Sequence, residues 1–552
     1  MKKMKKITFL MLFAFVALVL NAQISRYIKV SATGAGNGTS WADAAGTADI
    51  QTQIDAVAAD ASQGTVYFAA GTYLIAAQIQ LKNNVQLMGG YAADGSGTRD
   101  LLNNQTILDG QFNKRILYTG DQSPFVAFTK ITKVDGFVLQ RGSSSYGSAA
   151  AISIGTVLEN CIIRNNNGST YGAAVFIKRH ATLANPTVGW NQGAALINCL
   201  VVNNSSSNYS AAIFVNQDTH FSVANCVIAN NKSTDATNGV GGLYWGQNVR
   251  YSRISNSIFS NNIAPISTRN NIVFQNTSEI QLAIFNNYFS DAAYVDADIT
   301  AANGNKNATD IASPGFAGAT SFEGYDAAKM AEIADADWRL RSNSVLIGLG
   351  SNIAGKADIP YPYVISTFGG VARSFTTVTT DVMGSARIIN STVEMGSYEF
   401  NPIVVTVANS DAAKGTVSSS VTVSKGSSTS ITANNTPPWV FSNWSDGSNT
   451  YTATQSGTNP NFTYTYAFVP TANVTMTASW EKGVWTGLEN TNMNSYKIIG
   501  NSLVFDTPTT AEIINLQGKV MHKLNKETIV NFSHKGIYII RYNNNNITKI
   551  IF

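Results

Sequence analysis

Charged residues are scarce in this chain of 552 residues, at 13% against roughly 25% in an average soluble domain. The polar surface must therefore consist mainly of Asn, Ser, Thr and Gly, which favours a β-rich exterior. Four of the 37 basic residues lie within the first six positions, so the rest of the chain has 33 basic and 33 acidic residues. This balance argues against the basic surface of a nucleic-acid binder.

Cysteine is also rare, with only Cys161, Cys199 and Cys226, and no C-x-x-C motif occurs. An odd number without paired spacing argues against a disulfide framework or a zinc site. We therefore expect no metal and no cofactor. A redox or metal role for these thiols is the alternative.

Long apolar runs are missing after residue 20. Residues 1–6 are basic, residues 7–20 form an apolar run of 14 residues, and the small residue Ala22 follows. This pattern predicts a secretory signal peptide over 1–22, with an uncleaved anchor as the alternative. No Cys follows the predicted cut, and no later stretch is long enough for a transmembrane helix.

A repeat occupies the middle of the chain. LENCIIRNNNGSTYGAAVFI (158–177) recurs as LINCLVVNNSSSNYSAAIFV (196–215), and shorter copies follow in VANCVIANN (223–231) and ISNSIFSNN (254–262). The anchor positions are spaced by 25, 38, 27, 31 and 30 residues, at Gly136, Cys161, Cys199, Cys226, Ser257 and Asn287. Short alternating runs between Asn-rich turns are strands, and units that cannot bury their apolar face alone must stack. The chain is therefore predicted to be all-β, with a right-handed parallel β-helix as its main domain.

Stacking in register predicts a buried column of the three thiols, since Cys is small and is often buried. It also places the paired asparagines at one corner, where Asn tolerates left-handed backbone and its amides can form a ladder. A calcium or glycan role is the alternative for these pairs, which are Asn165/Asn166, Asn203/Asn204, Asn230/Asn231 and Asn261/Asn262.

Two groups of residues are candidates for function. Aligning the coils brings Lys178, Arg179 and His180 beside Asp218, with His220 nearby. A His–Asp pair flanked by cations could bind or deprotonate an acidic sugar, although a solvated ion pair is the commoner outcome. The second group is a column of Tyr146, Tyr171 and Tyr209, to which Trp245 is added as a ligand-binding candidate. Exposed rings would stack on sugars, whereas packed rings would only finish a corner.

The sequence gives little support for catalysis by clustered carboxylates. Lyases of β-helix type need carboxylates for calcium and a Lys or Arg base, and hydrolases need converging acids. Between residues 130 and 290 the acids are scattered, at Asp135, Glu159, Asp218, Asp235 and Glu279.

The opening residues resemble a known family. YIKVSATGAGNGTSWADA (27–44), a short helix over 49–61 and TVYFAAGTY (65–73) resemble the N-terminal part of secreted, pectate-lyase-like β-helix proteins of Bacteroidetes. Residues 337–352 and 381–400 are similar to the closing segment of choice-of-anchor Q β-helix proteins. The matching positions are Asp337, Arg339, Leu340, Asp381, Gly384, Arg387, Gly396 and Glu399. Asp381, Arg387, Glu394 and Glu399 are predicted to form a paired network that closes the last coil, with a ligand site as the alternative.

Two small C-terminal β-domains are predicted. Residues 401–482 alternate with period two, and WVFSNWSDG (439–447) resembles the internalin-type B-repeat, in which Trp439, Phe441 and Trp444 would pack in the core or form a sugar platform. After a linker over 483–495, residues 496–552 resemble the type A sorting domain of the type IX secretion system. The positions that carry this match are Gly518, Gly536, Tyr538 and Lys549.

These expectations combine into one hypothesis. Residues 23–400 form a β-helix of a secreted protein that is attached to the cell surface or released, with the type IX machinery as its export partner. Its predicted task is adhesion to, or binding of, an extracellular polysaccharide or host matrix glycan. A polysaccharide lyase or glycoside hydrolase is the alternative, and a structural stalk is the third.

Overall fold

A computed structural model of the chain describes most residues outside the predicted leader. These are 23–60, 64–120, 131–153, 155–172, 174–178, 194–217, 219, 221–247, 252–275, 282–291, 301–318, 324–329, 332–333, 336–350, 380–387, 389, 393–400, 402–424, 427–458, 460–483, 496–542 and 547–551. The signal-peptide prediction therefore lies outside the described residues. The chain divides into two compact units, and the solenoid belongs to the first.

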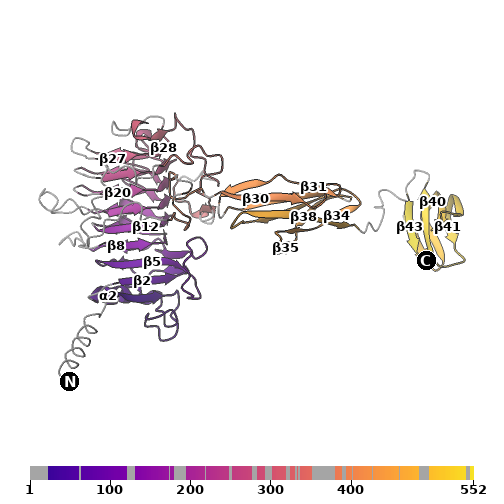
Figure 1. The fold of residues 1–552 in the computed structure, drawn as a ribbon, viewed down its shortest axis with the longest axis horizontal. Helices are drawn as coiled ribbons and strands as arrows, with labels where there is room; N and C mark the ends of the chain where they lie inside the picture. The colour runs from indigo at the N-terminus through magenta and orange to yellow at the C-terminus, as the bar shows by residue number, and fades with distance from the viewer. Residues whose placement is uncertain are drawn as a thin grey trace, which may run out of the picture. The chain divides into compact units, whose positions relative to one another are not determined.

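Three long parallel sheets build the solenoid (Figure 1). Sheet A contains β1 (Ile24–Ile28), β2 (Gly64–Ala69), β5 (Val85–Tyr91), β8 (Thr132–Asp135), β12 (Thr156–Glu159), β16 (Ala194–Ile197), β20 (Phe221–Ala224), β24 (Ser252–Ser255) and β27 (Leu282–Phe285). Sheet B contains β3 (Gly71–Leu74), β6 (Thr106–Asp109), β9 (Phe137–Gln140), β13 (Ile162–Arg164), β17 (Leu200–Val202), β21 (Val227–Ala229), β25 (Ile258–Ser260), β28 (Tyr288–Phe289) and β29 (Lys306–Asn307).

Sheet C closes the third side of the coils, and a short sheet D precedes it in four of them. Sheet C contains β4 (Ile79–Gln80), β7 (Leu117–Tyr118), β11 (Ala150–Ile152), β15 (Val175–Ile177), β19 (Ile213–Val215), β23 (Leu243–Trp245) and β26 (Ile272–Phe274). Sheet D contains β10 (Ser143–Tyr146), β14 (Asn167–Tyr171), β18 (Ser205–Ser206) and β22 (Lys232–Ser233).

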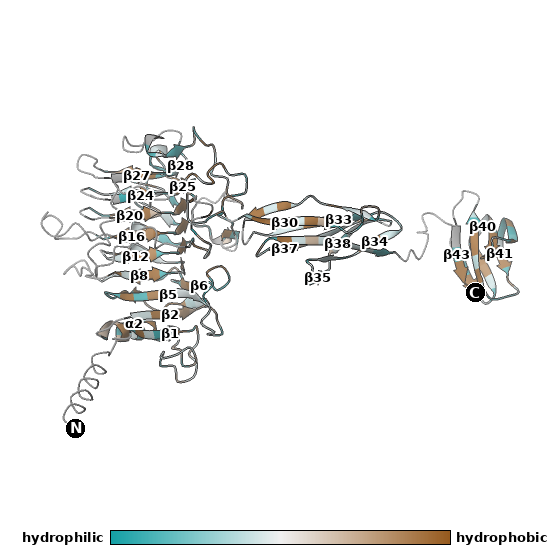
Figure 2. Cartoon of the chain, in the orientation of Figure 1, coloured by the Kyte–Doolittle hydropathy of each residue, from teal (hydrophilic) through white to brown (hydrophobic). Residues whose placement is uncertain are grey.

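From Cys161 onward the repeats stack in register, as their alignment predicts. The first anchor position is wrong by one residue: Ile162 pairs with Val138, so Cys161 aligns with Phe137 and not with Gly136. Leu158 pairs with Leu196 in sheet A and Phe176 pairs with Phe214 in sheet C. Many strands of the solenoid are rich in hydrophobic residues (Figure 2), and successive side chains point to opposite faces of each sheet. The inward column of sheet A is apolar, and its members are Val134, Leu158, Leu196, Val223, Ile254 and Ile284.

Left-handed residues form two of the corners. Between sheets A and B the turn residue has a φ of 49–53° in five coils, at Asn160, Asn198, Asn225, Asn256 and Asn286. Between sheets B and D it has a φ of 52–56°, at Asn165, Asn203, Asn230 and Asn261. Asn adopts this conformation more readily than other residues with a side chain, so these positions fix the corner geometry.

The column of thiols and the asparagine ladder are both confirmed. Cys161, Cys199 and Cys226 are free and fully buried, and the Cys199 backbone N–H lies 3.4 Å from the Cys226 sulfur. In each asparagine pair the first residue takes the left-handed corner and the second is buried. The amides of Asn166, Asn204 and Asn231 donate to the next coil, whereas that of Asn262 donates to Asn271. The separate asparagine column between sheets A and B was not predicted.

The N-terminal end is capped by α2 (Ile50–Ala59), which follows the 3-10 turn η1 (Thr47–Asp49). Ile50, Ile54 and Val57 are buried against the first coils, which confirms the predicted cap. Further 3-10 turns lie at η2 (Ser267–Arg269), η3 (Ala301–Asn303) and η4 (Ala327–Lys329).

Residues beyond the last coil cover part of the outer face of sheet B. Trp338, Leu346 and Met395 form an apolar cluster with Leu200 and Ile258 of the sheet. The predicted network of charged residues lies in this covering segment, and its members contact one another. The Arg387 Nε lies 2.9 Å from Glu399, and Asp381 accepts the Glu399 backbone N–H.

Two antiparallel sheets follow the solenoid. One contains β32 (Val421–Ser424), β30 (Pro402–Asn409), β38 (Val474–Lys482), β34 (Trp439–Ser445) and β35 (Thr450–Tyr451), and the other contains β31 (Gly415–Val417), β33 (Thr429–Asn435), β37 (Asn461–Phe468) and β36 (Thr454–Thr458). A bulge between Phe441 and Asn443 shifts the parity of β34, so that Phe441 and Trp444 are both buried. Trp439 is half-buried under Lys414, whose Nζ lies 4.3 Å from the ring centre.

The last strands form one antiparallel sheet, with β39 (Tyr496–Ile499), β40 (Ser502–Asn515), β41 (Val520–Asn531), β42 (Ile537–Tyr542) and β43 (Ile547–Ile551). The predicted class is therefore confirmed: the chain is all-β, with a right-handed parallel β-helix and additional C-terminal β-domains. Within the part that the structure describes, no helix has the length and apolar character needed to cross a membrane.

Candidate functional site on the outer face of sheet A

The outer face of sheet A carries one continuous row of side chains. Parallel pairing aligns them from the first coil onward in the order Tyr27, Tyr67, Met88, Asp135, Glu159, Ile197, Ala224, Ser255 and Phe285. Neighbouring members lie about 4.8 Å apart because that is the spacing of hydrogen-bonded strands. The row begins with aromatic rings, passes through carboxylates and continues with small or apolar groups.

Four half-buried rings form the aromatic part. Tyr27 stacks on Tyr67 with ring centres 5.5 Å apart, and Trp41 leans against Tyr27 at 4.9 Å. Tyr91, at the end of β5, meets Tyr67 edge-on at 5.3 Å and Trp41 at 5.7 Å. Because the rings meet at mixed angles, parts of their faces and edges stay accessible, as their intermediate exposure shows.

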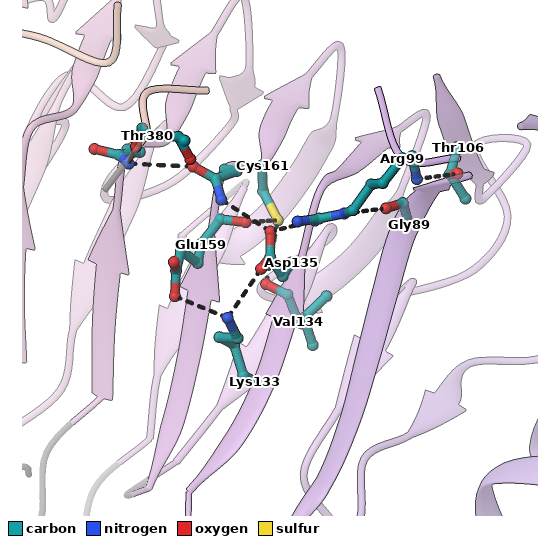
Figure 3. Close-up of polar contacts among 12 residues, drawn as sticks. Gly89, Arg99, Thr106, Lys133, Val134, Asp135, Glu159, Cys161 and Thr380 are labelled. Atoms are coloured by element: carbon teal, nitrogen blue, oxygen red, sulfur yellow. Dashed lines mark hydrogen bonds and ion pairs between the residues drawn. The ribbon is translucent and has the colours of Figure 1, made fainter. Parts of the chain in front are cut away.

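Two cations and two carboxylates follow the rings along the row, and Figure 3 shows how these charged groups contact one another. The Asp135 carboxylate lies 2.6 Å from the Arg99 guanidinium and 2.9 Å from the Lys133 ammonium. Lys133 also lies 3.3 Å from Glu159 and so bridges two carboxylates of adjacent coils. The Asn160 amide donates to Asp135 at 2.9 Å, and Arg99 also donates to the Gly89 carbonyl.

Asp135 is held as an ionised group. Burial alone raises the pKa of its carboxyl, but Lys133, Arg99 and the Asn160 amide outweigh burial and lower the pKa below its usual range. A carboxylate that keeps its charge and has three partners is a poor general acid, and its lone pairs are already occupied. This cluster therefore orients polar groups for hydrogen bonding rather than for proton transfer.

Aromatic rings beside fixed hydrogen-bonding groups suit a sugar polymer. The ring faces can pack against the apolar faces of pyranose rings, and Arg99, Lys133 and Glu159 can bond hydroxyls. The charges of the two cations and two carboxylates cancel, so the site has no excess charge of either sign.

Of the residues that were predicted as weak catalytic candidates, one lies away from this face, and the others are outside the described residues. Lys178 is 4% exposed, donates to the Gly120 carbonyl and lies with its Nζ 4.3 Å from the centre of the Tyr118 ring. A buried, bonded ammonium of this kind is not available as a base, which corrects the proposal for Lys178. Arg179, His180, Asp218 and His220 lie outside the described residues.

The predicted tyrosine column exists, but its rings pack on one another. Tyr171 stacks on Tyr146 at 5.4 Å and on Tyr209 at 4.7 Å, so both of its faces are covered by neighbouring coils. The same rings lean on the buried Phe176 and Phe214 of sheet C. The column therefore matches the packed alternative, although Tyr146 keeps 41% exposure.

The prediction that Trp245 binds a ligand is wrong. It is fully buried and packs on Phe221 inside the solenoid core, so it cannot contact an external ligand. Its place at the inward position of β23 follows from strand parity, since Tyr244 is the outward residue of that strand. Alignment of β23 with β19 pairs Tyr244 with the outward-facing Phe214, and this alignment identifies Tyr244 as the outward residue.

The sheet A site was not identified from the sequence. Its sequence signal is the pairing of Tyr27 with Tyr67 and of Met88 with Asp135. Predicting this pairing requires the register of three coils that precede the repeat. Arg99 arrives from a loop, and no periodic pattern marks it.

Comparison with known proteins agrees with this architecture. Residues 27–241 match the family model described as rhamnogalacturonase A/epimerase, pectate lyase-like. The solenoid therefore has the pectate-lyase-like β-helix fold, and the sheet A site lies within the matched residues. The crystal structure of pectate lyase Pel9A is similar at 12% identity and a TM-score of 0.29, covering 68% of this chain and 96% of that one. No curated protein sequence matches the chain.

The residues that carry the sorting-domain resemblance lie on the last sheet. Gly518 has a φ of 80° in the turn between β40 and β41, and Tyr538 of β42 packs on Phe532. Gly536 directly precedes β42, and Lys549 is exposed on β43.

Proposed function

We propose that this protein binds an extracellular polysaccharide along the outer face of sheet A and does not cleave it. The observation that supports binding is the row from Tyr27 to Glu159, in which aromatic rings adjoin carboxylates that are ionised and already paired. Catalysis of the lyase or hydrolase type would require a carboxyl or cation that is poised for proton transfer. Binding requires only fixed ring faces and hydrogen-bonding groups.

The balanced charge of the site predicts which kind of polysaccharide should bind. We expect a neutral polymer to bind at least as tightly as an acidic one, with little dependence on salt, since screening weakens only net charge attraction. This expectation separates the site from a uronate-binding groove lined with excess cations.

A polysaccharide-cleaving enzyme is the second candidate, because the matched family is named for a rhamnogalacturonase and an epimerase. Arg179, His180, Asp218 and His220 would then be the first residues to substitute. A structural stalk is the third candidate and would show neither binding nor cleavage.

The test uses the whole purified protein with a panel of neutral and acidic polysaccharides, followed by size-exclusion chromatography. We expect intact polymer that carries the protein with it. Tyr67→Leu should weaken binding at least fivefold, whereas Tyr171→Leu, in the packed tyrosine column, should leave it unchanged. Both substitutions remove a half-buried stacked tyrosine, so the pair controls for general loss of packing.

Each other outcome identifies a different candidate. Shrinking polymer would establish the enzyme. Loss of binding in Tyr171→Leu but not in Tyr67→Leu would move the site to the tyrosine column. Absence of both binding and cleavage across the panel would favour the stalk or a protein partner.

We also propose that the protein is secreted and reaches the cell surface or the medium through the type IX machinery. The leader pattern of residues 1–22 and the resemblance of residues 496–552 to a sorting domain support this route. Removal of residues 496–552 should trap the protein inside the outer membrane, and fractionation of the producing cells measures this. Unchanged surface display of the truncated protein would contradict the proposal.

A further inference from the structure

The accessible part of the sheet A row ends at β12. Tyr27, Tyr67 and Met88 are half-buried, and Glu159 keeps 12% side-chain exposure. Every outward side chain that the structure describes on β16, β20, β24 and β27 is at most 4% exposed, and these are Ala195, Ile197, Ser222, Ala224, Arg253, Ser255 and Phe285. Arg253 is the clearest case at 2%, because an arginine on an outer face is mostly exposed unless something covers it. Other parts of the protein therefore cover the row beyond β12.

A residue that follows the solenoid lies directly at this boundary. The Thr380 carbonyl accepts a hydrogen bond of 2.6 Å from the side-chain amide of Asn198, the corner residue after the buried Ile197. The same amide donates to Asn160 at 3.1 Å, and Asn160 donates to Asp135 of the charged cluster at 2.9 Å. Figure 3 shows Thr380 next to this cluster. One series of hydrogen bonds thus joins the closed end of the row to the site.

The other end of the row is accessible among the described residues. In the order of the described strands β1 is the edge of sheet A, and its outward residue Tyr27 is half-buried. From Tyr27 to Glu159 the row crosses four strand spacings, which is about 19 Å. The site is therefore a short row that is open at the first coil and closed after β12.

We infer that this site receives the end of a polysaccharide and not its middle, an inference that rests on the proposed binding of a polysaccharide by sheet A. A polymer that lies on Tyr67 and reaches Glu159 would meet the covered positions of β16, so its last unit must stop beside Glu159 and Lys133. A terminal sugar unit has a free hydroxyl where an internal unit has a linkage. The Glu159 carboxylate can accept from this hydroxyl, and the Lys133 ammonium can donate to it.

The first test counts polymer ends. The probes are linear β-1,4-galactan, linear arabinan and amylose, each offered to the whole protein intact and after partial acid hydrolysis, at the same total mass. Hydrolysis that shortens the average polymer tenfold creates ten times as many ends. The amount of protein bound per gram at saturation, measured by calorimetric titration, should therefore rise about tenfold. A site for internal units would keep nearly the same capacity per gram.

The second test uses variants at the two ends of the row. The ligands are oligosaccharides of two to eight units, prepared from the probe that binds. Glu159→Gln changes the group beside the closed end without changing its shape, and it should weaken the binding of every length at least threefold. Tyr27→Leu is the matched variant at the open end. It should weaken only the oligosaccharides that are long enough to reach the first coil, and leave the disaccharide unchanged.

Two results would overturn the inference. One is a capacity per gram that stays constant when the polymer is shortened. The other is binding of the disaccharide that Tyr27→Leu weakens and Glu159→Gln leaves unchanged, because the ligand would then lie on the rings at the open end. Both results retain polysaccharide binding, so they leave the proposed function intact. Absence of binding by all three probes would instead remove the proposed binding of neutral polymers and this inference together.

Discussion

Asn166 and Asn204 are joined by two hydrogen bonds across adjacent coils: the backbone N–H and the side-chain amide of Asn166 both donate to the Oδ1 of Asn204, at 3.0 and 2.9 Å. The same pair of bonds joins Asn204 to Asn231 and Asn231 to Asn262. Each amide also donates to carbonyls of its own coil and of the preceding one. The ladder therefore ties four coils together in the interior, where every lost bond leaves a buried group unpaired.

The first prediction concerns this ladder. Asn204→Ala should lower the free energy of unfolding by about 2–4 kcal/mol, because it orphans donors and acceptors in three coils. Urea denaturation measures the loss. Asn261→Gly is the control: Asn261 is exposed at a left-handed corner, which glycine also adopts, so its cost should stay below about 1 kcal/mol. Equal costs for the two variants would contradict a structural role of the ladder.

The second prediction concerns the thiols. Cys161, Cys199 and Cys226 have no exposed surface, and burial raises the pKa of Cys199. Since the thiolate is the reactive form, a maleimide should label none of them in the native protein and all three in urea. Cys199→Ser should cost less than about 1 kcal/mol, because Ser257 takes the same place in the column two coils on and bonds the Ser255 carbonyl. Rapid native labelling would show that the column opens.

The repeats allowed the middle of the fold to be predicted, but the candidate site lies where the repeats fade. Cys161, Cys199 and Cys226 recur with the same neighbours, so the register of the central coils could be read directly. Tyr27, Tyr67 and Asp135 align only through backbone pairing, because hydrogen bonding between parallel strands is indifferent to the side chains. For Trp245 the strand was predicted correctly, but the face of the strand on which the residue lies was not.

The third prediction separates two carboxylates of sheet A. Asp135 has 3% side-chain exposure and three partners, so Asp135→Asn should cost about 2–4 kcal/mol by removing the counter-charge of Arg99 and one of the two carboxylates that pair with Lys133. Glu159→Gln removes one contact of 3.3 Å and should cost less than about 1 kcal/mol. The pKa of Asp135 is lowered in the folded chain, so its contribution should be present above the unfolded pKa near 4 and be lost as the pH falls. Urea titrations of both variants at pH 7 and pH 3 measure these differences.

The fourth prediction has the opposite dependence on pH and concerns Glu399. Burial raises the pKa of its carboxyl to about 8, with Arg387 opposing and Glu394 reinforcing the shift. Between pH 4.5 and 8 the folded chain therefore holds a proton that the unfolded chain has released, and stability must fall as the pH rises through this window. Glu399→Gln keeps an acceptor for Arg387 but cannot ionise, so it should become more stable than the wild type by about 1–3 kcal/mol above pH 8.

Hydrogen exchange of peptides from residues 380–400 measures this difference locally, which avoids assuming that the whole chain unfolds in one step. Protection of these peptides in the wild type should decrease from pH 5 to pH 9 after correction for the intrinsic exchange rate, and Glu399→Gln should remove most of that decrease. Glu512→Gln is the control, because Arg541 and Lys523 lower the pKa of Glu512 and its loss should bring no gain at high pH. A wild type whose corrected protection stays constant over this range would show that Glu399 is ionised in the folded chain, with Arg387 outweighing the effect of burial.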